Sequence, residues 1–551
     1  MADVSWRNEN RVSRRVLFII LFVALSVRFL WMTTQKSNIG GEGAEYARLA
    51  ENLIKGRGYV GIFGQATQLI FPPLYPLTIG GLSFFTQNFE LTGRVVSLIM
   101  GTLLVLPVLF IALHMYGRRI ALLAGVLIAG HPLLINLSTE VYSEGTYITL
   151  LMAGVFWSLR TLDTQDSRQS MLAGACFGLA YLTRPEAIVY PFLLTAASSI
   201  SALMRNQEVK KSLICSIRMV ILFLFLAAPY ALFHSVHTGQ IRFEGKSTYN
   251  FMLGQRMISG MEYTEATYGI DKDLNEVGPG LHLDAIHVNA RPSVQDAAHY
   301  VLMSARSNLK SIYYAIFLSR AFGSPLLIVL VIVGLFRTIW TLERVNNEGF
   351  IALVFASTCL PLFSVVHFWD RYAFPLLPFL ILWASKGIGE LSEWLAGTAA
   401  SLKFKIMQQG TAIQIGVRCV LCTILLFYAT TDYADELKSR LRGETDEVKQ
   451  AGTWLASLPG PKRIMASSSV IPYYADGTWL PFPYAESSLA LTYIQHKRPN
   501  FIVLVSRSSD TRPYLRQWMR DGIPDETAKL IFEERASDEE DVKIYKWDVQ
   551  E

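Results

Sequence analysis

Long apolar stretches separated by short polar segments dominate the first 430 residues. Stretches of about 17 to 25 apolar residues have the length of a helix that crosses the hydrocarbon core of a bilayer. The pattern predicts eleven such membrane-spanning helices. They lie at 15–33, 93–116, 118–138, 143–161, 169–185, 187–204, 212–234, 318–340, 349–367, 372–389 and 411–430.

Lysine and arginine gather in every second connection between these stretches. The basic segments are the N-terminus and the turns near 118, 160–168, 205–211, 337–344 and 403–405. Because cytoplasmic loops are enriched in lysine and arginine, we predict that these segments lie in the cytoplasm. The opposite, external face then receives the loops at 34–92 and 235–310 and the C-terminal tail.

The character of the chain changes after about residue 435, where charged and apolar residues become mixed. The pattern predicts a helix at 445–458 and strands at 463–466 and 500–506. It also predicts a terminal hairpin formed by 529–534 and 543–549. About 110 residues can bury a core of their own, so we expect a small α/β domain in the tail.

The predicted fold is therefore mainly α, a polytopic membrane protein with a small extracytoplasmic α/β domain. The membrane domain covers 1–430, with external loops 34–92 and 235–310, and the α/β domain covers 431–551. The composition agrees, since 51% of the residues are hydrophobic and only 17% are charged, against about 25% in soluble proteins.

The net charge and the positions of the cysteines argue against several other classes of protein. The net charge of +5 is accounted for by the basic cytoplasmic loops and gives no indication of a nucleic-acid partner. All five cysteines lie in apolar stretches. This placement argues against a disulfide framework and against a thiolate metal site.

The loop after the first apolar stretch begins with an acidic helix. Tyr46, Leu49 and Leu53 recur at helical spacing, which predicts an amphipathic helix in the membrane interface. Glu42 and Glu45 open this helix one turn apart. Acids in a first turn also stabilise the helix dipole by about 0.3–1 kcal/mol, so spacing alone leaves their role open.

The order of features in this loop resembles a known family. Glu42 is followed by Tyr46, then by Gly-x-Gly-aromatic at 56–59 and by Pro-Pro-Leu-Tyr-Pro at 72–76. The pattern resembles the first external loop of superfamily C glycosyltransferases, in the branch of protein O-mannosyltransferases and the lipid A aminoarabinose transferase. The resemblance implies an integral membrane enzyme that takes a sugar from a polyprenyl phosphate carrier.

The resemblance also implies a role for the first acid. The family usually has Asp at this place, and alignment on Tyr46 makes Glu42 its counterpart, longer by one methylene. Inverting transfer needs one external carboxylate to accept the proton of the acceptor hydroxyl. Glu42 and Glu45 are therefore the candidate catalytic residues, with Glu42 first.

A second acidic group lies at the predicted outer end of the third and fourth spans. Glu140 and Glu144 occur there, and Glu144 resembles the acid that related enzymes have in the second external loop. These acids are candidates to position the acceptor or to bind a divalent cation. His131 is interpreted as a buried packing residue, and no spacing matches a known metal motif, so the metal stays uncertain.

Three arginines lie at predicted outer boundaries and are candidates to bind the donor phosphate. An arginine can hold a phosphate with two parallel hydrogen bonds. Arg320 and Arg184 rank ahead of Arg371, because Arg371 has Asp370 beside it as a local partner. The resemblance to the aminoarabinose transferase implies a lysine before Pro-Pro-Leu that helps with the lipid phosphate, whereas the apolar residues Ile70 and Phe71 stand there in this chain.

The sequence thus predicts an inverting glycosyltransferase that uses a polyprenyl phosphate sugar on the extracytoplasmic side. The acceptor is a glycan, a lipid or a protein, and the partners include the bilayer. The alternative is a polytopic transporter or flippase of a lipid-linked saccharide, although the ionisable residues gather at one face and not at mid-membrane. We expect a bacterial inner membrane location, with a cytoplasmic N-terminus and a periplasmic C-terminal domain.

Overall fold

The computed structural model describes most of the chain. The described residues are 12–35, 37–64, 66–278, 294–314, 322, 324–364, 370–401, 410–432, 434–435, 438, 446–534 and 541–548.

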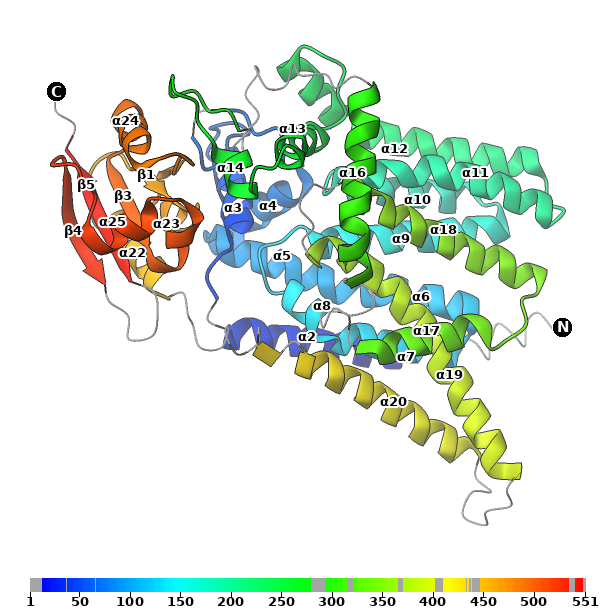
Figure 1. Ribbon diagram of the computed structural model, residues 1–551. Helices are drawn as coiled ribbons and strands as arrows, with labels where there is room; N and C mark the ends of the chain where they lie inside the picture. Colours follow the sequence, from blue (N-terminus) through cyan, green and yellow to red (C-terminus); the bar gives the residue numbers. More distant parts are fainter. Residues whose placement is uncertain are drawn as a thin grey trace.

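A bundle of long helices forms the larger part of the molecule (Figure 1). Each predicted span coincides with a helix or a pair of consecutive helices. These are α2 Arg14–Thr34, α5 Phe89–Leu103 with α6 Val105–Tyr116, α7 Arg118–Gly130 with α8 Pro132–Leu137, α9 Glu144–Thr164, α10 Ser167–Tyr181, α11 Val189–Met204, α12 Val209–Thr238, α17 Ser324–Phe336, α18 Leu342–Ser364, α19 Leu377–Ser401 and α20 Gly410–Asp432.

Within the described residues, seven helices are long and apolar enough to cross a membrane. The predicted fold class, a helical polytopic membrane protein with a C-terminal sheet, is therefore confirmed. The number of eleven spans remains a prediction, because several of the remaining helices are short.

Shorter helices gather at the end of the bundle that faces the C-terminal sheet (Figure 1). They are α3 Gly41–Ile54, α4 Leu74–Thr86, α13 Lys246–Ile258 and α14 Tyr263–Tyr268. The longer helix α16 Val294–Tyr313 packs against α13 and α18. The predicted acidic helix is α3, and its residues from Gly43 to Asn52 are buried. Its charged side contacts protein, since Arg48 forms an ion pair with Asp476 of the C-terminal part at 2.5 Å.

The C-terminal part contains a five-stranded sheet in the order β2-β1-β3-β5-β4. The strands are β1 Arg463–Ala466, β2 Thr478–Pro481, β3 Phe501–Val505, β4 Ala528–Glu534 and β5 Val542–Trp547. β1 is parallel to β2 and β3, whereas β5 is antiparallel to β3 and β4. The predicted strands and the hairpin are confirmed. The sequence pattern missed β2, which has four residues and ends in a proline that argues against a strand.

Helices cover both faces of this sheet (Figure 1). They are α22 Asp446–Ser457, α23 Val470–Tyr474, α24 Ser487–Lys497 and α25 Leu515–Asp521. The core on the face of α22 and α23 continues into the first loop, where it includes Tyr46, Ala47 and Ile62. The core on the other face belongs to α24 and α25. The C-terminal sheet and the helix that bears Glu42 therefore share one hydrophobic core.

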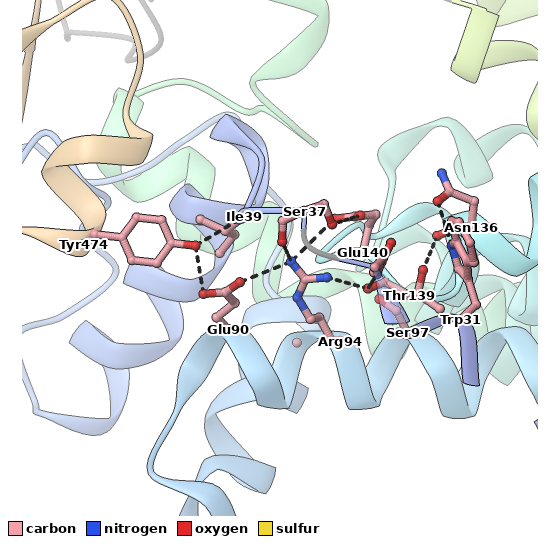
Figure 2. Close-up of polar contacts among 12 residues, drawn as sticks. Trp31, Ser37, Ile39, Glu90, Arg94, Ser97, Asn136, Thr139, Glu140 and Tyr474 are labelled. Atoms are coloured by element: carbon pink, nitrogen blue, oxygen red, sulfur yellow. Dashed lines mark hydrogen bonds and ion pairs between the residues drawn. The ribbon is translucent and has the colours of Figure 1, made fainter. Parts of the chain in front are cut away.

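A buried arginine on α5 ties together the segments that lead into α3 and α9 (Figure 2). Arg94 donates to the carbonyl oxygen of Ser37 at 2.8 Å and to that of Thr139 at 3.1 Å. Its charge is balanced by Glu90 at 3.1 Å and by Glu140 at 3.9 Å. One guanidinium thus fixes the relative positions of the first turns of α3 and α9.

The C-terminal part joins this network through Tyr474, as Figure 2 shows. The Tyr474 hydroxyl donates to Glu90 at 3.0 Å and accepts from the backbone N–H of Ile39 at 3.1 Å. The Ser469 hydroxyl donates to the carbonyl oxygen of Gly41 at 3.1 Å. The start of α3 is therefore held from two sides, by the helical bundle and by the sheet.

We predict that Arg94→Met lowers the unfolding temperature of the purified protein. The substitution removes the buried cation that faces Glu90 and Glu140 and the side-chain donor to the Ser37 carbonyl. Removing one partner of a buried ion pair costs about 3–5 kcal/mol. Thermal unfolding in detergent measures the change, with Arg57→Met at an exposed position as the control. Equal unfolding temperatures for the two variants would contradict the role given to Arg94.

Candidate active site

A cavity of about 280 Å³ lies between the helical bundle and the C-terminal sheet. It is bounded by α3, the turn at 183–186, α13, the loop after β1 and the 3-10 helix η4 Asp370–Leu376. Together with the 62–72 segment, these elements bring residues from distant parts of the sequence to one space. Its polar lining includes Glu42, Arg184, Lys246, Arg371, Ser467 and Ser468.

Glu42 and Arg371 form a close ion pair in this cavity. Glu42 stands in the first turn of α3, which begins at the diglycine 40–41, and its Oε2 lies 2.6 Å from Nη2 of Arg371. The Arg371 guanidinium also lies over the rings of Tyr142 and Tyr372, at 5.6 Å from each centroid. Arg371, which the sequence ranked last of the three arginines, therefore lines the cavity and pairs with Glu42.

Glu144 lies behind this pair, in the first turn of α9. Its Oε1 accepts from Arg184 Nη1 at 2.8 Å and lies 3.9 Å from Arg371 Nη1. The residue is 1% exposed, and within the described part of the chain its Oε2 has no hydrogen-bond partner. The structure thus brings together four of the predicted site residues: Glu42, Glu144, Arg184 and Arg371.

Glu186 and Lys246 complete the cluster, and sequence reasoning did not select them. Glu186 lies 3.4 Å from Arg184 and 3.1 Å from Lys246. Lys246 is the first residue of α13. Gly245 before it packs closely on the first loop, since an added Cβ would lie 2.2 Å from the carbonyl oxygen of Leu69. Two features of the sequence could have indicated these residues. Glu186 follows Arg184-Pro185 directly, and Lys246 lies in a long loop that is predicted to be external.

Glu45 lines the same cavity but is bound to its own loop. Its carboxylate accepts from the backbone N–H of Ile62 at 2.9 Å and from Nε2 of Gln68 at 2.6 Å. Gly61 allows this approach, since an added Cβ would lie 1.7 Å from Glu45 Oε1. Glu45 therefore holds the 61–68 segment against α3.

The pKa values of the two acids of α3 are shifted in opposite directions. Burial raises the pKa of Glu45, and the hydrogen bonds it accepts offset this only in part. Burial acts in the same sense on Glu42, but the charges of the nearby cations, Arg371 foremost, outweigh it and hold the pKa of Glu42 below its ordinary value. Of the two carboxyl groups, that of Glu42 is therefore the more acidic.

Other sequence candidates lie elsewhere. Glu140 belongs to the network of Figure 2, where its Oε1 accepts from the Ser37 hydroxyl at 2.8 Å. His131 is buried between α7 and α8. Arg320 lies outside the described residues. Among the residues that the structure describes, no group of three or more His, Cys, Asp or Glu side chains is placed to hold a metal ion.

Comparisons with known proteins bear on the fold that carries this site. Residues 71–233, which include Glu144 and Arg184, match the model of the family described as dolichyl-phosphate-mannose-protein mannosyltransferase. ArnT from Cupriavidus metallidurans, in a structure with bound undecaprenyl phosphate, is similar in fold. Its TM-score is 0.59 at 13% identity, over 97% of this chain and 98% of that chain. The chain has the fold of the superfamily C glycosyltransferases.

A second enzyme of known structure has a similar fold. The oligosaccharyltransferase AglB from Archaeoglobus fulgidus, in complex with an inhibitory peptide and a dolichol-phosphate, has a TM-score of 0.62 at 11% identity, over 96% of this chain and 73% of that chain. No curated protein matches the sequence. The resemblance predicted from the first loop is confirmed, and the matching family and structural neighbours are glycosyltransferases.

We predict that the Glu42 carboxyl ionises at a lower pH than the Glu45 carboxyl. Infrared difference spectra recorded across a pH titration, with Glu42→Gln and Glu45→Gln to assign the two bands, measure both. Arg371→Met should move the Glu42 band to higher pH, because it removes the main stabilising charge, and should leave the Glu45 band in place. Coincident titration of the two bands, or a reversed order, would contradict the charge arrangement described above.

Proposed function

We propose that this protein is an inverting glycosyltransferase that moves a monosaccharide from a polyprenyl phosphate carrier to an acceptor hydroxyl. The observation behind the proposal is that one cavity contains the ionised carboxylate of Glu42 together with Arg184, Lys246 and Arg371. The reaction needs a carboxylate that acts as a base and accepts a proton, and cations that bind the phosphate. The undecaprenyl phosphate bound to ArnT and the dolichol-phosphate bound to AglB support this class of carrier.

Glu42 is the proton acceptor in this proposal. It takes the proton of the acceptor hydroxyl, whose oxygen attacks C1 of the sugar on the face opposite the phosphate. The bond between C1 and the phosphate oxygen breaks, and the electron pair leaves with the phosphate. A single displacement inverts the configuration at C1, and the products are a glycoside and polyprenyl phosphate.

The cations stabilise the charge that develops on the leaving phosphate. Each of the three is paired with a carboxylate in the structure: Arg371 with Glu42, Arg184 with Glu144 and Glu186, and Lys246 with Glu186. A donor phosphate therefore competes with these carboxylates for the same donors. When the phosphate takes the Arg371 guanidinium, Glu42 loses its partner at 2.6 Å and becomes available to the acceptor.

The positions before Pro-Pro-Leu, 70–71, are apolar and provide no cation for the phosphate. Lys246 provides this cation in the proposal. The close packing of Gly245 on the Leu69 carbonyl brings Lys246 beside this segment, and Ile70, Phe71 and Lys246 line the same cavity. The lysine that precedes Pro-Pro-Leu in the aminoarabinose transferase is thus replaced in space by a lysine from another loop. Arg320 stays a further candidate for the phosphate.

We assign acceptor positioning to Glu144, whose buried Oε2 has no partner in the described chain. The acceptor itself is a glycan, a lipid or a protein. The cavity and the C-terminal sheet lie at one end of the bundle, and we place this end in the periplasm of a bacterial inner membrane. In support, segments predicted to be cytoplasmic contact each other, as Asp163 pairs with both His114 and Arg205.

The alternative of a transporter or flippase of a lipid-linked saccharide has less support. A transporter fold binds its substrate at mid-membrane. The candidate site here instead adjoins the C-terminal sheet and is lined partly by it. Purified protein in detergent separates the two, because transfer of labelled sugar from a polyprenyl phosphate sugar needs no intact membrane, whereas transport does.

We predict that Glu42→Gln lowers the turnover number for sugar transfer by about 10²-fold or more, because it removes the proton acceptor and keeps the side-chain volume. Binding of polyprenyl phosphate should persist. Glu45→Gln is the matched control one turn away, and it should retain turnover in protein that stays folded. The roles of the two acids are reversed if Glu45→Gln loses turnover and Glu42→Gln keeps it.

We predict that Arg371→Lys weakens binding of polyprenyl phosphate roughly tenfold, because lysine keeps the charge but cannot form two parallel hydrogen bonds. Arg184→Lys should act in the same direction. A binding isotherm with the detergent-solubilised protein measures the effect, and Arg520→Lys at an exposed position is the control. Unchanged affinity in both site variants would remove these arginines from the phosphate site.

A further inference from the structure

The loop that follows β1 forms one wall of the cavity. It consists of Ser467, Ser468 and Ser469, all of which line the cavity together with Glu42. The hydrogen bond from Ser469 to the carbonyl oxygen of Gly41, at 3.1 Å, fixes the loop one residue ahead of Glu42. The C-terminal part therefore contributes hydroxyl groups directly beside the proposed proton acceptor.

The topology of the sheet singles out the same loop. β1 lies between β2 and β3 and is parallel to both. The chain passes from β1 to β2 through α23 on one face, and from β2 to β3 through α24 on the other face. Strand order therefore reverses beside β1, and open α/β sheets bind ligands at the carboxyl ends of strands where this happens. Ser467–Ser469 is the segment at the carboxyl end of β1.

The chemistry of this wall suits a sugar. The Ser467 hydroxyl has no hydrogen-bond partner in the part of the chain that the structure describes, and the Ser468 hydroxyl accepts from the backbone N–H of Val470 at 3.2 Å. Both hydroxyls keep a proton to donate. Phe63 and Trp479 add aromatic surface next to them, with ring centroids 5.0 Å apart. Apolar rings with a few placed hydroxyls are typical of a site for a small polar ligand.

We propose that this serine loop is the subsite that binds the hydroxyl groups of the sugar on the donor. The inference rests on the proposed function, which places the donor phosphate at the cations of the same cavity. Because the sugar is covalently attached to that phosphate, it has to lie within the cavity, and the serine loop is the wall contributed by the C-terminal sheet. The cavity residues from the sheet are all uncharged, so the subsite takes a neutral sugar.

The test compares two probes, a polyprenyl phosphate and the same lipid carrying mannose. The double variant Ser467→Ala with Ser468→Ala should bind polyprenyl phosphate as the parent does, because the cations are intact. Its affinity for polyprenyl phosphate mannose should fall roughly tenfold, as expected for the loss of two hydrogen bonds between neutral groups. Ser488→Ala, an exposed position on α24, is the matched control.

The outcomes separate the two proposals. If the parent protein fails to bind polyprenyl phosphate, the proposed function itself is wrong. If the parent binds both probes and the double variant loses neither affinity, or loses both equally, the serine loop is not a sugar subsite. Unchanged affinity for the mannose lipid with slower transfer would place the acceptor at the loop and overturn the assignment to the donor sugar. Ser467→Thr keeps a hydroxyl and should keep most of the affinity.

Discussion

The ion pair between Glu42 and Arg371 is the interaction on which the geometry of the site depends. A buried charge without a partner costs several kcal/mol, so each charged group in the cavity has to meet an opposite charge. These pairs join α3 to η4, α9 to the 183–186 turn, and that turn to α13. Segments that are distant in the sequence are thereby fixed within hydrogen-bonding distance of one another.

The same pairing gives the site its proposed order of events. Three cations and three carboxylates balance in the structure, so the site attracts a phosphate only by exchanging one carboxylate for another anion. That exchange releases Glu42 at the moment when the donor is in place.

The C-terminal sheet is a structural part of this site. It shares a hydrophobic core with α3, and Tyr474 and Ser469 hold the backbone on both sides of residue 40. Its loop after β1 lines the cavity. The sheet therefore holds α3 in place, and in the proposed reaction its serine loop contacts the donor sugar.

The sequence by itself determined the helical membrane fold, the helix with Glu42 and Glu45, most strands of the C-terminal sheet and the resemblance of the first loop. These features follow from hydrophobic length, periodicity and local motifs, which a linear pattern contains. Only the tertiary structure decided which acid faces the cations. Glu42 and Glu45 stand one turn apart, but Glu45 is bound by the backbone at Ile62, whereas Glu42 meets Arg371. Lys246, Glu186 and the serine loop likewise entered the site through packing between distant segments, because ion pairs and close glycine contacts depend on proximity in space, which no local pattern reports.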